Sequence, residues 1–292
     1  MEKTEITLKV SVIIPVYNAD RFVGRAVESA IVQRQTGEVI LVEDGSSDGS
    51  LEVCRQLASE HEEVFLYSHS DNSNHGAGAS RNLGIQKSEE PIIAFLDADD
   101  YYLKDRFTEA ERILETDSRI DGVYEAIGVH CQDARAKRVW SEKGDGDLTT
   151  MKERIPPEDL LSALVHYSSG NFHLDGLVIR KRCLWSSNIF YDELKVHQDT
   201  AMIIQLAYYA TIVPGRLKEP VAMRRVHDYN RYTAIGNICK TRMQMWNVLL
   251  KWSLEEDLSK TMISKIFRNY LYFGYLAFKG KLSKGPFRPG LI

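Results

Sequence analysis

The chain has 292 residues, of which 43% are hydrophobic and 27% are charged, and its 41 acidic and 37 basic residues leave a formal net charge of -4. These values are typical of soluble globular proteins and exclude the disordered, collagen-like and coiled-coil classes. The near balance of charge gives no reason to expect a nucleic acid as a partner. The length allows one large domain or two small ones.

The cysteines and the N-terminus predict a cytoplasmic protein. The N-terminal sequence MEKTEITLKV carries charges and lacks the apolar core of a secretory signal. No apolar run reaches the roughly 18 residues that a membrane span needs. The four cysteines form no C-x-x-C pair and are expected to be reduced: Cys54, Cys131, Cys183 and Cys239.

The first hundred residues alternate apolar runs with amphipathic ones. The run KVSVIIPVYN is rich in β-branched residues without polar interruption, which is typical of a strand buried on both faces. Because such strands alternate with helices of suitable length, we expect a doubly wound α/β sheet. The predicted strands are 9–18, 38–46, 64–70 and 91–100, and the predicted helices are 21–33, 48–61 and 78–87.

Beyond residue 100 the pattern is looser. We expect a helix over 108–116, a strand over 121–131, a flexible polar loop over 132–157 and a helix over 198–209. The segments GLVIR, TIVPG and PVAMRRVH are predicted to be strands that extend the same sheet. Residues 1–236 are thus expected to form one domain, and residues 237–292 a helical, basic and aromatic C-terminal extension.

Polar residues follow three of the predicted strands. They lie at Pro15–Asn18, Glu43–Ser46 and Asp97–Asp100. Ligands of open α/β sheets bind beyond the carboxyl ends of the strands. One such loop alone is adequately explained by turn and cap residues, but three together favour a binding site.

The triplet Asp97-Ala98-Asp99 predicts a metal site. Carboxylates at positions i and i+2 of an extended strand point the same way and need a counter-ion, either Mg²⁺ or Mn²⁺ or a nearby arginine. The alternative is a helix cap near Tyr101. We favour the metal, because unpaired buried carboxylates are costly and a cap needs one oxygen.

The stretch Gly76-x-Gly78-x-x-Arg81 is a weak match to a dinucleotide-binding motif, since arginine stands where the third glycine belongs. Glycines before a helix still offer backbone N–H groups to an anion. Arg81 is suited to pair with Asp97 or with a phosphate.

The motifs VSVIIPVYNAD, LVEDGSSDGS, N-x-G-x-G-x-S-R-N-x-G over 74–84, and FLDADD occur in order and cover residues 10–100. In this the chain resembles the family 2 inverting glycosyltransferases of GT-A fold. The resemblance implies a GT-A type α/β fold with a mostly parallel sheet, in which 1–100 is the nucleotide-binding half and 101–236 the acceptor half. It also implies transfer of a sugar from a nucleoside diphosphate donor with inversion.

The resemblance also implies roles for single residues. The metal, Mn²⁺ or Mg²⁺, is expected at Asp99. In VHQDTAM, Asp199 matches the family's catalytic base, although the family more often has Glu-Asp where this chain has Gln198-Asp199. This departure concerns contacts to the acceptor more than catalysis, and it is the feature that supports a non-catalytic binding subunit. Without the resemblance, Asp199 would be interpreted as a helix cap. The residues expected to bind the donor are Pro15, Tyr17 and Asp44 at the base, Arg81 and Asp97 at the ribose and diphosphate, and Asn18 beside them.

The segment MRRVHDYNRYT resembles the family's Arg-x-His motif, and Arg225 and His227 stand where contacts to the diphosphate or the metal are expected. Both side chains share one face if the strand continues. The alternative is a basic loop at the end of a strand.

The segment from Leu258 to Ile292 has no acidic residue. Its seven bases lie among aromatic residues, which is typical of an interfacial helix on anionic lipid. A helix that packs its aromatics on the domain is an equal alternative. The bases are Lys260, Lys265, Arg268, Lys279, Lys281, Lys284 and Arg288.

The sequence therefore predicts a metal-dependent inverting glycosyltransferase with a preference for a UDP-sugar. The expected acceptor is a glycan, free or lipid-linked, of a polysaccharide or the cell envelope, and the expected location is cytoplasmic, with peripheral contact at the inner face of the membrane. A non-catalytic sugar-nucleotide-binding subunit and a nucleotidyltransferase are the alternatives, and the second lacks the basic Gly-rich loop that it needs after the first strand.

Overall fold

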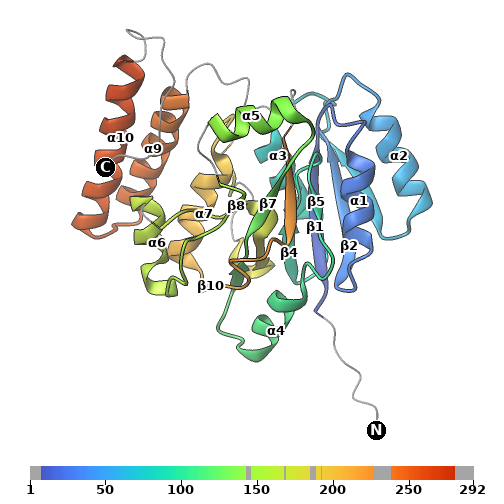
Figure 1. The fold of residues 1–292 in the computed structure, drawn as a ribbon, viewed down its shortest axis with the longest axis horizontal. Helices are drawn as coiled ribbons and strands as arrows, with labels where there is room; N and C mark the ends of the chain where they lie inside the picture. The colour runs from blue at the N-terminus through green and yellow to red at the C-terminus, as the bar shows by residue number, and fades with distance from the viewer. Residues whose placement is uncertain are drawn as a thin grey trace.

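The computed structural model describes residues 8–142, 146–167, 169–184, 189–191, 193–226 and 238–279. A central sheet is flanked by helices on both faces, and a pair of helices lies at one side of the molecule (Figure 1). The predicted α/β class, with a mostly parallel sheet and a C-terminal helical extension, is confirmed.

The N-terminal part alternates strands and helices as predicted. Every residue of the first strand is buried, which explains its uninterrupted β-branched run. The strands are β1 (Val10–Val16), β2 (Thr36–Glu43), β3 (Val64–Ser68) and β4 (Ile92–Phe95), and the helices are α1 (Val23–Ile31), α2 (Ser50–Glu60) and α3 (Ala77–Lys87).

The large sheet has seven strands in the order β10-β6-β9-β4-β1-β2-β3, completed by β6 (Gly122–Tyr124), β9 (Leu177–Arg180) and β10 (Ile212–Pro214). Neighbouring strands are parallel except at β9, which is antiparallel to β4 and to β6. The chain runs from β1 outward through β2 and β3, whereas β4 lies on the other side of β1. A crevice forms at such a switch point, beyond the carboxyl ends of the strands.

A second sheet has the order β5-β11-β7-β8 and consists of β5 (Tyr101–Tyr102), β7 (Ile127–Cys131), β8 (Leu148–Thr149) and β11 (Ala222–Val226). The segments GLVIR and TIVPG extend the large sheet as predicted. The prediction for PVAMRRVH is wrong, because its strand β11 pairs with β7 in the second sheet. Only the two ends of β11 are buried, whereas β1, β4 and β6 of the large sheet are buried along their length. The two arginines in the sequence of β11 are consistent with a half-exposed strand, because a strand buried on both faces has an uninterrupted apolar run.

Two further predictions differ from the structure. The segment 121–131 is two strands, β6 and β7, in different sheets. The polar stretch 132–157, expected to be a loop, contains α5 (Ala134–Glu142) and β8. The helix forms because Ala136 and Trp140 pack against Val226 in a small hydrophobic cluster. These two apolar residues on one face anchor the helix to the domain, although the stretch 132–157 is polar on average.

The remaining helices are α4 (Thr108–Thr116), α6 (Pro157–His166), α7 (Gln198–Tyr209), α9 (Ile238–Glu255) and α10 (Lys260–Lys279), with short 3-10 turns at Leu174–Gly176 and Lys181–Cys183. The predicted bounds of α7 are correct. Helix α10 packs on α9 and α6, and α9 packs on α7 (Figure 1).

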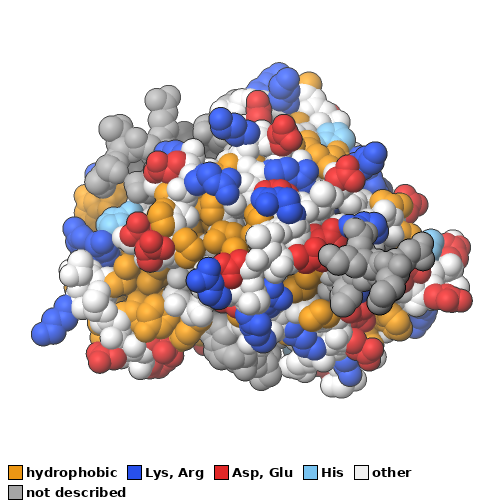
Figure 2. All heavy atoms as spheres, turned by 90° about the horizontal axis from the view of Figure 1, so that it is seen from below, with side chains coloured by type: hydrophobic (Ala, Val, Ile, Leu, Met, Phe, Trp, Pro, Cys, Tyr) orange, Lys and Arg blue, Asp and Glu red, His pale blue; other side chains and the backbone are white. Residues whose placement is uncertain are grey.

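The C-terminal helices share the core of the sheet. One hydrophobic cluster extends from Ile13 and Phe95 in the sheet to Trp246 of α9 and Phe273 of α10. Within the part of the chain that the structure describes, no helix combines the length and the apolar character required to span a membrane. The face at the bottom of the view in Figure 1 mixes acidic, basic and apolar side chains (Figure 2).

Candidate active site

A cavity of about 650 Å³ opens at the carboxyl ends of β1, β2 and β4 and extends to the start of α7. It lies at the switch point of the sheet, because β4 ends at Phe95, opposite Ile13, while β1 continues to Val16. Eight of the ten predicted site residues line it, namely Pro15, Tyr17, Asn18, Asp44, Arg81, Asp97, Asp99 and Asp199.

The other two predicted residues, Arg225 and His227, do not add to this set. Arg225 is not among the lining residues, and its guanidinium lies 4.8 Å from the ring centroid of Phe22. The arginine of β11 that does line the cavity is Arg224, the preceding residue, whose guanidinium lies 5.7 Å from the ring centroid of Trp140. His227 lies outside the described residues.

Asp44 fixes the loop before α3. Its Oδ1 accepts a hydrogen bond from the backbone N–H of His75 at 2.8 Å, and its Oδ2 accepts one from Gly76 at 2.9 Å. Gly76 has a φ of 93°, a conformation that favours glycine. Because a carboxylate has about four acceptor positions, Asp44 can accept a further hydrogen bond from a base.

Asn18 connects the ends of β1 and β2. Its backbone has a φ of 50°, and its Oδ1 accepts a hydrogen bond from the N–H of Ser47 at 2.8 Å. Its own N–H donates to Oγ of Ser46 at 3.0 Å. Tyr17 is 37% exposed at the wall of the cavity. The two loops that were expected to hold the base are therefore joined to each other.

Arg81 and Asp97 form an ion pair at 2.5 Å, and the arginine side chain is buried. Burial raises the pKa of Asp97, but the charges of Arg81 and His173 outweigh burial and leave that pKa below its ordinary value. Asp97 is therefore ionised, and Arg224 contributes to the same effect.

Three carboxyl groups, those of Asp97, Asp100 and Asp175, each offer an oxygen within 4.8 Å of the others. Burial and the neighbouring charges of Asp99 and Asp175 raise the pKa of Asp100 well above its ordinary value. Oδ2 of Asp175 is buried and accepts no hydrogen bond from any described residue. Hard oxygen donors with an unsatisfied acceptor among them fit Mg²⁺ or Mn²⁺.

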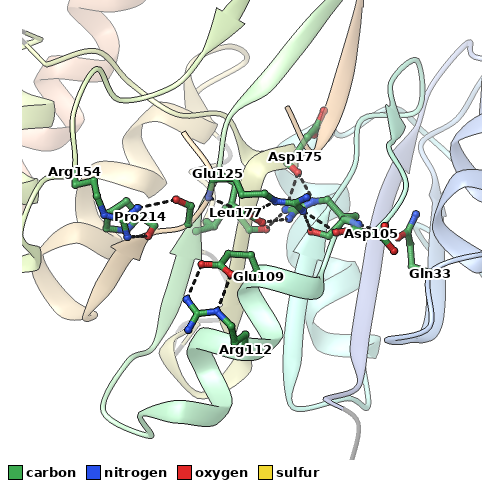
Figure 3. Close-up of polar contacts among 12 residues, drawn as sticks. Gln33, Asp105, Glu109, Arg112, Glu125, Arg154, Asp175, Leu177 and Pro214 are labelled. Atoms are coloured by element: carbon green, nitrogen blue, oxygen red, sulfur yellow. Dashed lines mark hydrogen bonds and ion pairs between the residues drawn. The ribbon is translucent and has the colours of Figure 1, made fainter. Parts of the chain in front are cut away.

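The backbone of Asp175 is held from behind by a buried guanidinium. Nε and Nη2 of Arg106 donate to the carbonyl of Asp175 at 3.1 and 2.9 Å, and Nη1 contacts Oε2 of Glu125 at 2.9 Å (Figure 3). Both members of this ion pair are fully buried, and Glu125 also accepts from Arg216. Losing one partner of such a pair typically costs about 3–5 kcal/mol, so the support of Asp175 is firm.

His173 lines the cavity together with Asp97 and Asp100. Its Nδ1 lies 3.5 Å from Oδ1 of Asp175. Burial lowers the pKa of His173, but Asp175 and Asp97 outweigh burial and raise that pKa above its ordinary value. The sequence analysis identified neither His173 nor Asp175. They precede β9, and only the antiparallel direction of β9 brings its first residues to the carboxyl end of β4.

Asp199 lies in the first turn of α7 and lines the cavity. The preceding helix cap, His197, has a φ of 63°, and its Nε2 lies 3.2 Å from Oγ1 of Thr241 in α9. Burial lowers the pKa of His197 to about 4, so this ring is neutral at pH 7. The C-terminal extension thus contacts the residues that present Asp199.

Gln198 bridges two elements around the cavity. With its amide oxygen toward α3, it accepts from the N–H of Gly78 at 3.0 Å and donates to the carbonyl of Leu194. A Cβ at residue 78 would lie 3.3 Å from the amide carbon of Gln198, so the absence of a side chain at Gly78 allows Gln198 to approach its backbone. Gln198 therefore has a structural role, although the sequence analysis connected it with the acceptor.

A mostly parallel sheet with a polar crevice at its switch point, lined by carboxylates and arginines, defines the GT-A class of nucleotide-sugar-binding folds. The chain belongs to Glycosyl transferase family 2, whose family model matches residues 11–172. This confirms the family that the motifs of the first hundred residues indicated.

Curated relatives share this assignment. An uncharacterized glycosyltransferase of Rickettsia bellii is 28% identical over 257 residues, which are 86% of this chain and 34% of the relative. The minor teichoic acid biosynthesis protein GgaA of Bacillus subtilis is 24% identical over 254 residues, which are 80% of this chain and 54% of the relative. The chain spans 38%, 34% and 18% of the length of the first three curated relatives that it matches.

Solved structures agree on the fold. S. aureus TarS 1–349 in complex with UDP-GlcNAc has a TM-score of 0.69 at 18% identity, covering 95% of this chain and 76% of TarS. The mannosyltransferase PcManGT of Pyrobaculum calidifontis, in complex with GDP-Man and Mn²⁺, has a TM-score of 0.55 at 15% identity, covering 96% and 76%. At these identities the likeness concerns the fold alone.

Proposed function

We propose that the chain transfers a sugar from a nucleoside diphosphate sugar, preferably a UDP-sugar, to a hydroxyl of a cell-envelope glycan, with inversion. The observation that carries the proposal is that the three predicted strand ends and the predicted base Asp199 line one cavity. The choice of UDP is supported by TarS, which is solved with UDP-GlcNAc. The choice of acceptor is supported by GgaA, named for teichoic acid biosynthesis.

Different residues of the cavity serve the different parts of the proposed reaction. Asp199 accepts the proton of the acceptor hydroxyl while that oxygen bonds to the anomeric carbon, and the bond from this carbon to the diphosphate breaks in the same step. Arg81, which is paired with Asp97, and Arg224, whose charge acts on the same carboxylate, line the cavity and face the charge that develops on the departing diphosphate. Asp44 and Tyr17 bind the base. A single displacement needs no protein nucleophile.

The donor set fits a divalent metal, Mn²⁺ or Mg²⁺, held by Asp99 together with the cluster of Asp97, Asp100 and Asp175, of which Asp97 and Asp100 also line the cavity. A bound metal would neutralise charge on the diphosphate. Support comes from the orphaned oxygen of Asp175 and from the mannosyltransferase relative, which is solved with Mn²⁺.

The alternative of a non-catalytic subunit rested on Gln198 in place of glutamate. Its bridge between Gly78 and Leu194 gives this residue a structural explanation. No described feature now favours the alternative.

Peripheral contact with an anionic membrane through α10 is also part of the proposal. The helix packs its inner face, including Phe273, on the domain, and its outer face exposes a stripe of apolar residues. Positions separated by three or four residues lie on one side of a helix. The stripe consists of Phe267, Leu271, Tyr275 and Phe278, which are 44%, 50%, 57% and 69% exposed.

The positive charge of α10 favours an anionic lipid surface as the partner of this apolar stripe. Helix α10 contains four bases, Lys260, Lys265, Arg268 and Lys279, and no acid. Aromatic and basic side chains on one helix match an anionic headgroup layer. The three further bases of the tail, Lys281, Lys284 and Arg288, lie outside the described residues.

Nucleotide binding tests the proposed function. UDP and GDP with Mn²⁺ should raise the melting temperature of the full chain, since a ligand at 100 times its Kd stabilises by about 2.7 kcal/mol. The stabilisation by UDP should exceed that by GDP and should weaken in Asp99→Ala or with a chelator. Full glycosyl transfer by Asp99→Ala in chelator would overturn the metal assignment, and a lack of stabilisation by any nucleoside diphosphate would overturn the function.

A further inference from the structure

Two cationic side chains of the cavity lining, Lys195 and Arg242, belong to the elements around Asp199 and have no role in the proposed mechanism. Lys195 precedes α7, which carries Asp199, and Arg242 lies on α9. The lining carboxylates other than Asp199 all belong to the ends of β1, β2 and β4 or to the loops that follow them. Among the described lining residues, Asp199 is therefore the one acid on the side of α7 and α9.

Arg242 is built into this position. It extends from the first turns of α9, and its guanidinium lies 5.4 Å from the ring centroid of the buried Phe273. The charges of Arg242 and of Asp199 both act on His197 and on Tyr167. The guanidinium and the predicted base therefore have the same neighbours, so a group bound by Arg242 would lie close to the reacting hydroxyl.

The two ends of the cavity differ in charge balance. At the donor end, Arg81 is paired with Asp97, and Arg224 acts on the same carboxylate. Around α7 and α9, Lys195 and Arg242 accompany a single lining carboxylate, Asp199, and no described carboxylate forms an ion pair with either cation. This excess of positive charge is suited to an anionic acceptor and gives no advantage to a neutral one.

We propose that Arg242 and Lys195 bind a phosphate group of the acceptor, next to the hydroxyl that receives the sugar. The planar fork of arginine matches phosphate oxygens in pairs, and a lysine adds a point charge. Phosphate offers more oxygens to these two cations than a carboxylate does. The inference rests on the proposed function, which it extends to the acceptor. The phosphate can belong to a phosphodiester polymer or to a lipid diphosphate.

The test is equilibrium binding to the full chain saturated with Mn²⁺ and the nucleoside diphosphate that stabilises it best, so that the donor end is filled. The probes are a fluorescent glycerol-phosphate oligomer, geranyl diphosphate and trigalacturonate. The variants are Arg242→Gln and Lys195→Gln, with Lys251→Gln on α9, an exposed residue outside the cavity lining, as the control.

We expect one of the two phosphate probes to bind, and we expect each variant except Lys251→Gln to weaken its binding about tenfold or more, the scale of a charge-assisted hydrogen bond. The probe that binds identifies the phosphate source. Lys195 is exposed, so its variant tests the site even if Arg242→Gln fails to fold.

Three results would overturn the inference. They are a lack of binding by both phosphate probes to a chain that binds nucleotide, equal affinity in the variants and the parent chain, and trigalacturonate binding as tightly as phosphate. A chain that binds no nucleoside diphosphate at all would instead contradict the proposed function.

Discussion

Gln198 holds α3 and α7 together through an amide that both accepts and donates. A glutamate at this position keeps the acceptor for Gly78 but places a second oxygen against the carbonyl of Leu194. We expect Gln198→Glu to lower the free energy of unfolding by about 1–3 kcal/mol, the cost of an unsatisfied buried polar group, as measured by urea denaturation at pH 7.

Gln205→Glu on the same helix is the matched control. Both glutamines are 6% exposed, but Nε2 of Gln205 donates to the hydroxyl of Tyr191 at 2.7 Å. That hydroxyl can reverse its role and donate to a carboxylate, so the cost should be smaller. Equal losses in both variants would contradict the proposed amide orientation of Gln198.

Asp199 is predicted to be the general base. Asp199→Asn is nearly isosteric and removes the proton acceptor, so kcat should fall by about 10²-fold or more while nucleotide affinity stays within twofold of the parent chain. Transfer kinetics and nucleotide titration on the same preparation check this.

Two neighbouring acids, Asp192 and Glu193, are the rival bases. Asp192 lies outside the described residues, and Glu193 is exposed and does not line the cavity. Normal turnover in Asp199→Asn together with an inactive Asp192→Asn or Glu193→Gln would assign the role of base to the residue whose variant is inactive. Activity in all of these variants would contradict a carboxylate base in this segment.

Residue-level prediction of which side chains lie together succeeded where the residues belong to one local motif. The DAD triplet and its partner Arg81 lie within one α/β unit, so their spacing alone brought them together. Asp175 and His173 could not be found this way, because an antiparallel strand inserted from far along the chain carries them to the site. Arg224 was missed because one residue of register decides which side chain of β11 faces the cavity.

At the scale of elements, buried parallel strands were predicted well and half-buried ones were not. β1 and β2 have long uninterrupted apolar runs, which only a fully covered sheet explains. β11 and β8 are short and mixed in polarity, so tertiary pairing decides their place. The second sheet that covers the crevice therefore had no clear pattern in the sequence.

The outer face of α10 gives a prediction at the same scale. The triple variant Phe267→Ser, Leu271→Ser and Tyr275→Ser removes most of the exposed stripe without touching the buried Phe273. Co-sedimentation with phosphatidylglycerol-containing vesicles should fall about tenfold or more, because each buried large apolar side chain contributes about 1.5–3 kcal/mol.

Phe65→Ser on β3 is the control for this experiment, since Phe65 is 42% exposed but far from the stripe in the chain. Vesicles of phosphatidylcholine alone should bind the parent chain more weakly, because they lack the anionic charge that the bases of α10 attract. Equal pelleting of the triple variant and the parent, or no pelleting of either, would leave α10 as a packed helix only.

At the scale of the whole molecule, we predict that the C-terminal helices and the sheet unfold as one cooperative unit. Their side chains belong to a single hydrophobic cluster, and Thr241 and Arg242 of α9 reach the residues around Asp199. The sequence predicted a separate extension because a break in composition near residue 237 is visible, whereas shared burial is not. A substitution that weakens the packing of the C-terminal helices should therefore lower the stability of the whole protein and also disturb the residues around Asp199.

Trp252 provides the test of this cooperativity. It is 4% exposed on α9, and its Nε1–H donates to the hydroxyl of Tyr209 on α7 at 3.0 Å. Trp252→Ala should cost about 3–5 kcal/mol and lower the melting temperature of one common transition by roughly 6–15 °C, measured by calorimetry. If the sheet and the extension were independent, a small transition would move alone and the main one would stay. Because Trp252 does not line the cavity, a parallel loss of nucleotide-induced stabilisation at the new melting temperature would show that the extension supports the site through packing.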